Sequence, residues 1–238
     1  MQKICWILLF SLFLFSCSKD TPSSIDFKSA SDYYPLKLGS WYVYDVDSIS
    51  YNDFTDPVTV DSVSYQIKEE LTDTFFDLEG NLSYEITRYK RMGNDSLIAD
   101  NMPWEISDIW WVKNRNGNIE RIEENNRYIT LSNPILQSKK WNGNAYNYMS
   151  SLMWEYTYKN IADTFGQYEN TITVVQKDSD TEIDSTCYIE VFAEEIGLVS
   201  RTRSFLESPS NSLPIPMIYK IEKGFQYFQT LKSYYIPE

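Results

Sequence analysis

Polar and apolar residues alternate along most of this 238-residue chain, and this period of two constrains the fold more than any other feature. Successive side chains of a β-strand point to opposite faces, so the alternation predicts strands that are buried on one side. No segment after Tyr33 shows the 3.6-residue period of an amphipathic helix. The strands that we expect span residues 39–51, 58–70, 72–78, 82–90, 109–113, 118–123, 127–131, 152–159, 170–177, 185–194, 197–206, 217–222 and 224–236.

Short turns separate these segments. Glu79-Gly80-Asn81 and Asn114-Arg115-Asn116-Gly117 each place a glycine between two strand patterns, which is typical of β-hairpins. Residues 134–153 are rich in Asn, Gly and Ser and predict a long loop or crossover. Ten to twelve strands with short turns predict an all-β fold, an antiparallel meander that forms a barrel or a strongly curled sheet. A two-sheet β-sandwich is the alternative.

The N-terminus has the pattern of a secretory signal. Lys3 precedes an apolar run over residues 4–15, interrupted only by Ser11, which is too short for a membrane-spanning helix of about 20 residues. Leu14-Phe15-Ser16-Cys17 then resembles the lipobox of bacterial lipoproteins. This resemblance implies removal of residues 1–16, a diacylglycerol on the Cys17 sulfur and acylation of the new amino terminus. An ordinary signal peptide with an incidental cysteine is the alternative.

The remaining chain divides into a tether and one domain. Residues 17–31 are polar, contain Pro22 and predict a flexible tether, and residues 32–238 predict a single β domain. The residue after the expected lipid site is Ser18. An Asp at this position would favour retention in the inner membrane, so we expect an outer-membrane lipoprotein of the cell envelope. Ser18-Lys19-Asp20 partly resembles the surface-export signal of Bacteroidetes lipoproteins, which leaves a periplasmic or a surface-facing domain open.

Two further segments are similar to an uncharacterised family of Bacteroidetes envelope lipoproteins. They are YYPLKLGSWYVY at residues 33–44 and EEIGLVSR at residues 194–201. The resemblance implies a compartment and a β architecture, and it implies no catalytic residue. Both segments also have a purely structural interpretation. Pro35 and Gly39 can turn the chain into the first strand, and Gly197 can separate two strands.

Composition excludes several classes of function. The chain has no histidine, which removes Ser-His-Asp and Cys-His catalysis and His-ligated metal sites. Its net charge of −13 becomes −14 without residues 1–16, which carry one Lys and no acid, and this excludes a general nucleic-acid binder. Cys5 leaves with the signal and Cys17 carries lipid, so Cys187 can form neither an intramolecular disulfide nor a thiolate metal site. We expect no cofactor and no metal.

Acidic residues give little indication of an enzyme. Residues 178–184 space their acids as calcium loops do, but Ile183 and Ile189 stand where an EF-hand needs Gly and Glu, which favours a solvated turn. Adjacent acids on a strand point to opposite faces and cannot converge on one glycosidic bond. A couple assembled from distant strands stays open, and we expect a non-catalytic protein. The adjacent pairs are Glu69-Glu70, Glu123-Glu124 and Glu194-Glu195.

Aromatic residues are the best functional indication, because the chain has 19 Tyr, 12 Phe and 7 Trp. Flat aromatic faces beside amide groups suit sugar rings, and an aromatic barrel mouth suits a lipid. The alternative is that the tryptophans fill a core without disulfides. Trp110 and Trp111 are adjacent in a strand, so one is expected inside and the other outside. The candidate ligand-binding residues are Trp110, Trp111, Trp141, Tyr146 and Tyr148.

These observations lead to one functional expectation. We expect a lipid-anchored envelope protein whose β domain binds or scaffolds, possible partners being a glycan or another nutrient fragment at the cell surface. The alternatives are an envelope lipid or lipoprotein carrier that uses the barrel interior and a structural module for protein interaction. Four short segments also resemble the Asp-Ser/Thr acceptor of Bacteroidetes O-glycosylation, with Ser48, Ser62, Ser96 and Ser185 as the acceptors.

Overall fold

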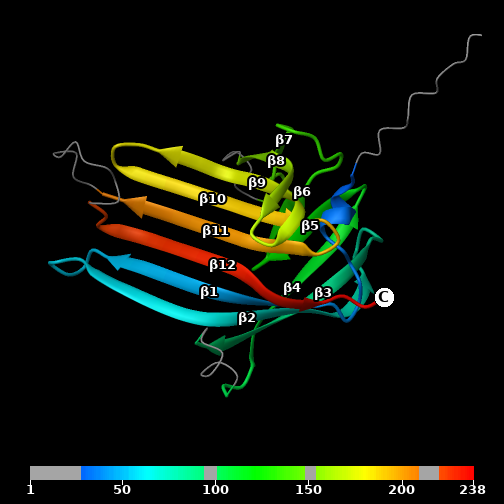
Figure 1. The fold of residues 1–238 in the computed structure, drawn as a ribbon, viewed down its shortest axis with the longest axis horizontal. Coiled ribbons are helices and arrows are strands. Elements are labelled where there is room, and N and C mark those ends of the chain that lie inside the picture. The colour runs from blue at the N-terminus through cyan, green and yellow to red at the C-terminus, as the bar shows by residue number, and fades with distance from the viewer. Residues whose placement is uncertain (1–27, 94–100, 148–153, 209–219) are drawn as a thin grey trace, which may run out of the picture.

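The computed structural model describes residues 28–93, 101–147, 154–208 and 220–238. These residues form twelve β-strands and one short 3₁₀ turn, η1 (Ala30–Tyr33), and the strands make one antiparallel, nearly closed barrel-shaped sheet (Figure 1). The strands are β1 (Trp41–Asn52), β2 (Thr59–Phe76), β3 (Leu82–Met92), β4 (Glu105–Arg115), β5 (Asn118–Glu123), β6 (Asn126–Leu131), β7 (Lys140–Asn142), β8 (Glu155–Phe165), β9 (Tyr168–Asp180), β10 (Asp184–Ala193), β11 (Gly197–Glu207) and β12 (Lys223–Tyr235).

The sheet is a meander whose two halves join through the ends of the chain. Its strand order is β6-β5-β4-β3-β2-β1-β12-β11-β10-β9-β8-β7, so β1 pairs with both β2 and β12. The β1–β12 register runs from Trp41 opposite Tyr235 to Tyr51 opposite Gly224. Because every strand belongs to this one sheet, the chain adopts the expected curled barrel and not the two-sheet sandwich.

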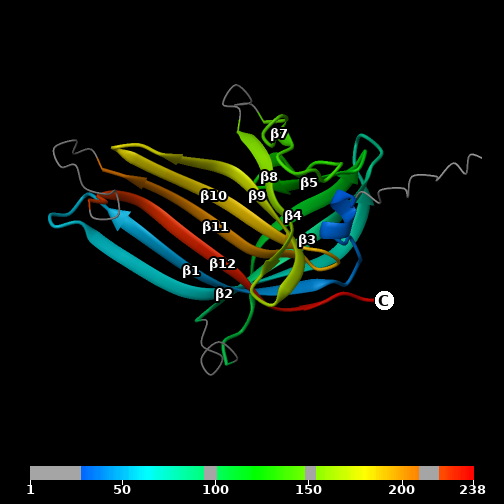
Figure 2. The ribbon, with the colours of Figure 1, turned by 45° about the horizontal axis from the view of Figure 1, so that its top comes forward.

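The two edge strands, β6 and β7, meet and nearly close the barrel. Ile129 on β6 donates its N–H to the carbonyl of Gly143 at 2.9 Å, and the indole N–H of Trp141 on β7 donates to the carbonyl of Ile129 at 2.8 Å. Both views place β5 beside β8, although these strands are far apart in the sheet order (Figures 1 and 2). Gly143 is required at this contact, because a Cβ there would clash with the ring of Tyr156.

The core fills the barrel at the end where η1 lies. Ala30 and Tyr33 of η1 are buried, and the N–H of Glu195 donates to the carbonyl of Asp32, which fixes η1 to the β10–β11 turn. The alternation of side chains along each strand supplies the rest of this core, as the sequence predicts. Its fully buried apolar members include Val46, Val112, Ile119, Leu131, Tyr158, Ile172, Val174, Phe192, Ala193 and Val199.

Three of the expected elements differ from those in the structure. The segments 58–70 and 72–78 form one strand, β2, because an irregularity between Leu71 and Asp73 absorbs the break in alternation without ending the pairing to β3. The expected strand 217–222 does not form in its described part, residues 220–222. The expected loop 134–153 contains β7, which pairs with β8 because Trp141 packs there against Tyr158, with 4.5 Å between the ring centroids.

Replacing Trp141 should weaken the seam between β6 and β7. We expect Trp141→Ala to lower the free energy of unfolding by about 3 kcal/mol, because it removes ring packing and one hydrogen bond together. The measurement is urea denaturation, with Phe76→Ala as the control because Phe76 is 74% exposed. Equal stability of the two variants would show that the seam does not hold the barrel.

Candidate functional site

Trp110 and Trp111 lie on opposite faces of β4, as expected for neighbours in a strand. Trp110 is 5% exposed and faces the interior of the barrel, where the Arg88 guanidinium lies 3.6 Å from its ring centroid. Trp111 is half-buried and faces outward. The outward ring is therefore the one that a ligand outside the barrel can contact.

Trp111 lines a hollow on the outer face of β3–β6, which we call the Trp111 hollow. It has a volume of about 530 Å³. The strand register builds it, because Glu85, Trp111, Ile122 and Arg127 stand opposite one another on four neighbouring strands. Its full lining is Phe75, Asp77, Ser83, Glu85, Trp111, Lys113, Ile122 and Arg127.

Two rings form an aromatic corner in the hollow. The rings of Phe75 and Trp111 are almost perpendicular, at 85°, with 6.5 Å between their centroids. Phe75 is 40% exposed and Ile122 is half-buried, so the apolar part of the hollow remains open to solvent. Such a corner offers two flat apolar surfaces to one ring-shaped ligand.

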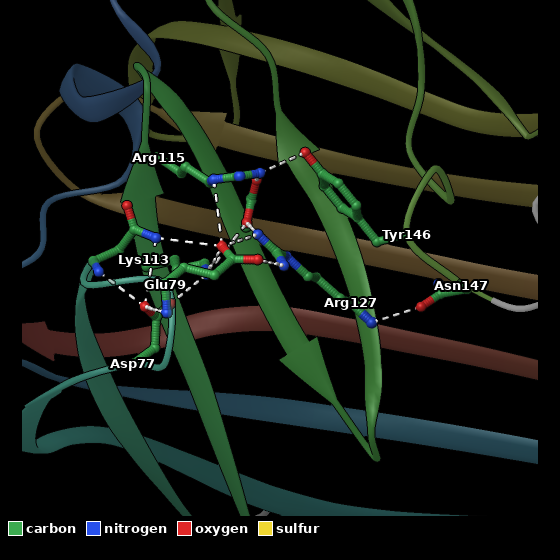
Figure 3. A network of polar contacts seen from close by, with 9 residues as sticks. Asp77, Glu79, Lys113, Arg115, Arg127, Tyr146 and Asn147 are labelled. Carbon is green, nitrogen blue, oxygen red and sulfur yellow. Dashed lines mark hydrogen bonds and ion pairs between the residues drawn. The ribbon is translucent and has the colours of Figure 1, made fainter.

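A network of ion pairs borders this corner (Figure 3). Lys113 Nζ lies 2.5 Å from Asp77 Oδ2 and 3.3 Å from Glu79 Oε2. Arg127 donates to both carboxylate oxygens of Glu79, at 3.1 and 3.2 Å, and to Glu120 Oε2 at 2.8 Å. The hydrogen bond from Lys113 lowers the pKa of Asp77 to about 2, and the one from Arg127 lowers the pKa of Glu79 to about 2. These carboxylates are therefore ionised acceptors held in fixed positions at neutral pH.

The structure brings together two of the five candidate ligand residues. Tyr146 is 46% exposed, and its ring centroid lies 4.2 Å from the guanidinium carbon of Arg127, which also lines the hollow with Trp111. Arg115 donates to the Tyr146 hydroxyl at 3.0 Å. Trp110 is inside and Trp141 belongs to the seam, whereas Tyr148 lies outside the described residues.

Sequence patterns did not indicate the other residues of the hollow. Phe75 and Asp77 come from the end of β2 and the turn after it, and Lys113 and Arg127 are charged residues on regular strands. The pairing register of β4–β6 aligns Arg127 with Trp111, whereas the two residues from β2 and its turn reach the hollow from outside that register.

A second charged network lies inside the barrel, and we call it the interior network. Arg121 is fully buried and contacts Glu69 at 3.2 Å and Glu123 at 3.2 Å. Arg201 contacts Glu123 at 3.3 Å and Glu190 at 2.7 Å. The remaining ion pairs of this network are Arg88 with Glu69, Arg88 with Asp108, and Arg203 with Glu123.

The interior network pairs Glu69 and Glu123, which belong to two of the three adjacent acid pairs. Burial alone would raise the pKa of Glu69, but Arg121, Arg88 and Arg201 together lower it. Burial would also raise the pKa of Glu123, but Arg201, Arg121 and Arg203 hold it well below its usual range. A glycosidase acid needs a raised pKa, so neither carboxyl group suits that role.

Other expected sites are distributed over the fold. Ser62 is exposed, and Ser48 and Ser185 are half-buried, while Cys17 and Ser96 lie outside the described residues. Within the four described ranges, no three His, Cys, Asp or Glu side chains are placed to hold a metal ion. No helix in those ranges has the length and apolar character needed to cross a membrane.

No known family model matches this chain, and no curated protein is significantly similar to it. The fold is similar to a solved structure described as "lipid-protein interactions in lipovitellin", with a TM-score of 0.37 and 12% sequence identity. The similarity covers 85% of this chain and 26% of the other, so the chain spans about a quarter of that protein's length. At this level the similarity carries no argument about function.

The interior network should make stability depend on pH. The folded pKa values of Glu69 and Glu123 are lowered, so their contribution to stability is fully present above the unfolded pKa of about 4.3 and is lost as pH falls through the folded values. We expect the free energy of unfolding to fall below about pH 4.5, by up to about 1.4 kcal/mol per pH unit for each carboxyl group.

The variant Glu123→Gln tests this origin. It should lower stability at pH 7 and flatten the loss between pH 4.5 and pH 3, because one of the two carboxyl groups no longer titrates. Urea denaturation across this pH range measures both effects. The neighbouring Glu124 is exposed, so Glu124→Gln is the matched control, and an equal slope in both variants would contradict the assignment.

Proposed function

We propose that this chain is a lipid-anchored protein of the cell envelope whose β domain binds a glycan in the Trp111 hollow and does not catalyse a reaction. The observation that carries the proposal is the aromatic corner of Phe75 and Trp111, bordered by ionised carboxylates and a guanidinium. A barrel-shaped sheet of this kind is compatible with a binding role or a carrier role.

The chemistry of the hollow fits a sugar ring. The apolar C–H face of a pyranose can lie against the Trp111 ring, and Phe75 covers a second side of it. Sugar hydroxyl groups can donate to Asp77 and Glu85 and accept from Arg127, which all line the hollow. The ion pairs already fix Asp77 and Arg127, so little side-chain freedom is lost when the ligand binds.

The barrel interior favours a glycan-binding module over a lipid carrier. A carrier needs an apolar chamber for acyl chains, because burying unpaired charge beside hydrocarbon is costly. The interior of the described barrel instead holds Arg121, Arg201, Glu69 and Glu190, all less than 5% exposed, next to a packed apolar core. The lowered pKa values of Glu69 and Glu123 support a non-catalytic role.

The proposed anchor rests on the N-terminal sequence. The apolar run before Cys17 and the lipobox-like residues around it would deliver the domain to the envelope. Two or more acyl chains hold a protein far more firmly than one, since each buried CH₂ contributes about 0.8 kcal/mol. The polar segment after Cys17 would then leave the domain free to meet a glycan.

Loss of the outward ring should weaken glycan binding. We expect Trp111→Ala to weaken binding to a hit from a glycan array at least tenfold, because the main stacking surface is lost, and this corresponds to about 1.4 kcal/mol. The measurement is a titration of the full chain with that glycan. The half-buried Trp104 lies outside the hollow, so Trp104→Ala is the matched control. Unchanged binding in Trp111→Ala would refute the proposed site.

The anchor can be tested by metabolic labelling with an alkyne fatty acid in a bacterial host. We expect the label on the wild-type chain and on Cys187→Ser, and its complete loss in Cys17→Ser, because the thioether forms on that sulfur. Mass spectrometry should place the mature amino terminus at Cys17. A labelled Cys17→Ser chain would contradict the proposed lipid site.

A further inference from the structure

A second cavity lies on the opposite, inner face of the sheet, and we call it the interior cleft. It has a volume of about 580 Å³, within the range of about 300–1,000 Å³ that is usual for small-molecule sites. Strands from both halves of the meander supply its walls, because the curl of the sheet brings the β5–β6 turn opposite β10–β12. Its aromatic lining consists of Tyr65, Trp110, Tyr128, Tyr188, Phe225 and Tyr227.

The cleft is rich in cationic groups for so acidic a protein. Arg88, Lys90, Arg201 and Arg203 line it, and the acids that line it are Asp108, Glu123 and Glu124. Asp108 and Glu123 are already paired with guanidinium groups of the interior network. Arg88 and Arg201 also pair with Glu69 and Glu190, so Lys90 is the lining cation left available to an anionic ligand.

Lys90 is the cation with the least compensation. Its Nζ lies 4.0 Å from the centroid of the Tyr65 ring, and it has no ion pair with any of the described residues. A cation over an aromatic ring is stabilised by about 0.5–2 kcal/mol, and the half-buried Lys90 ammonium keeps its N–H donors for solvent or a ligand. An anionic ligand would supply that acceptor.

Two buried donors in the cleft also lack a partner. The indole Nε1 of Trp110 and the Nε of Arg203 are buried, and neither makes a hydrogen bond with any described residue. An unsatisfied buried donor costs about 1–3 kcal/mol, so a ligand that accepts from these groups recovers that cost on binding. Burial raises the pKa of Tyr227 to about 12, although Arg201 opposes this, so its phenol stays neutral beside the ligand.

We propose that the interior cleft binds a sugar that carries a carboxylate. Lys90 and Arg203 donate hydrogen bonds to the carboxylate. The indole N–H of Trp110 donates to another oxygen of the same ligand. The tyrosine rings and Phe225 cover the faces of the sugar ring. The tyrosine hydroxyl groups form hydrogen bonds with its hydroxyl groups. This site lies on the other face of the sheet from the Trp111 hollow and does not depend on the function proposed for that hollow.

Calorimetric titration of the full chain with digalacturonate and with its dimethyl ester tests the proposal. Esterification removes the negative charge of each carboxyl group and adds a methyl group to it, and the comparison requires no change in the protein. We expect the acid to bind at least tenfold more tightly than the ester. Equal affinities, or no binding of the acid, would overturn the proposal.

Variants locate the binding site. Lys90→Met should lower the affinity for the acid several-fold, with Arg203 still in place, and leave the affinity for the ester unchanged. Lys140→Met removes the same charge at β7, where Lys140 is 61% exposed and pairs with Glu155, and it should bind like the wild type. Thermal unfolding checks that both variants fold.

The remaining outcomes are also decisive. Unchanged affinity of Trp111→Ala for the acid would support the interior cleft, and its loss would move the site to the Trp111 hollow and overturn the proposal. A similar loss in Lys90→Met and Lys140→Met would show a general charge effect and also overturn it. Tight binding of phenylacetate without binding of digalacturonate would contradict the assignment to a sugar acid.

Discussion

The interior network is the interaction on which the rest of the structure depends. Arg121 on β5 contacts Glu69 on β2 and, through Glu123, is joined to Arg201 on β11. These strands belong to the two halves of the sheet, so the network crosses the barrel and ties its walls together. Burying a guanidinium is costly unless carboxylates compensate its charge, so the ion pairs across the barrel favour the curl of the sheet that brings these groups together. In the described part of the chain, where Cys187 is a free thiol, these ion pairs take the place of covalent cross-links.

The same strands of the sheet carry a cavity on each face. On β4 the ring of Trp110 packs under Arg88 inside the barrel, while Trp111 is presented outside beside Phe75. The two cavities thus share strands but not side chains, and each is bordered by ion pairs that hold its polar groups still. Preorganisation of this kind lowers the entropic cost of binding, which is why aromatic surfaces on such a wall can serve as ligand sites.

Much of the fold follows from the sequence, because alternation and turn chemistry are local. Gly80 and Gly117, both with positive φ, mark the hairpins where the sequence predicts them, and the adjacent Trp110 and Trp111 point to opposite faces. The contacts that make the cavities are not local. Arg121 and Glu69 are 52 residues apart, and no pattern in the chain indicates that they meet. The seam at Trp141 likewise depends on how far the sheet curls, which alternation alone does not determine.

Charge distribution connects the fold to selectivity. Among the described residues, the buried charged side chains comprise four cations and four anions, so the negative charge of this part of the chain lies on its less buried surface. An extended polyanion would be repelled by this surface, and the repulsion weakens only within a Debye length of about 8–10 Å at physiological salt. A short ligand with one or two carboxylates meets much less of it and reaches Lys90 and Arg203 inside the cleft. The acidic exterior and the Lys90 ammonium in the cleft therefore act together, and under this proposal they favour a small acidic sugar over a long acidic polymer.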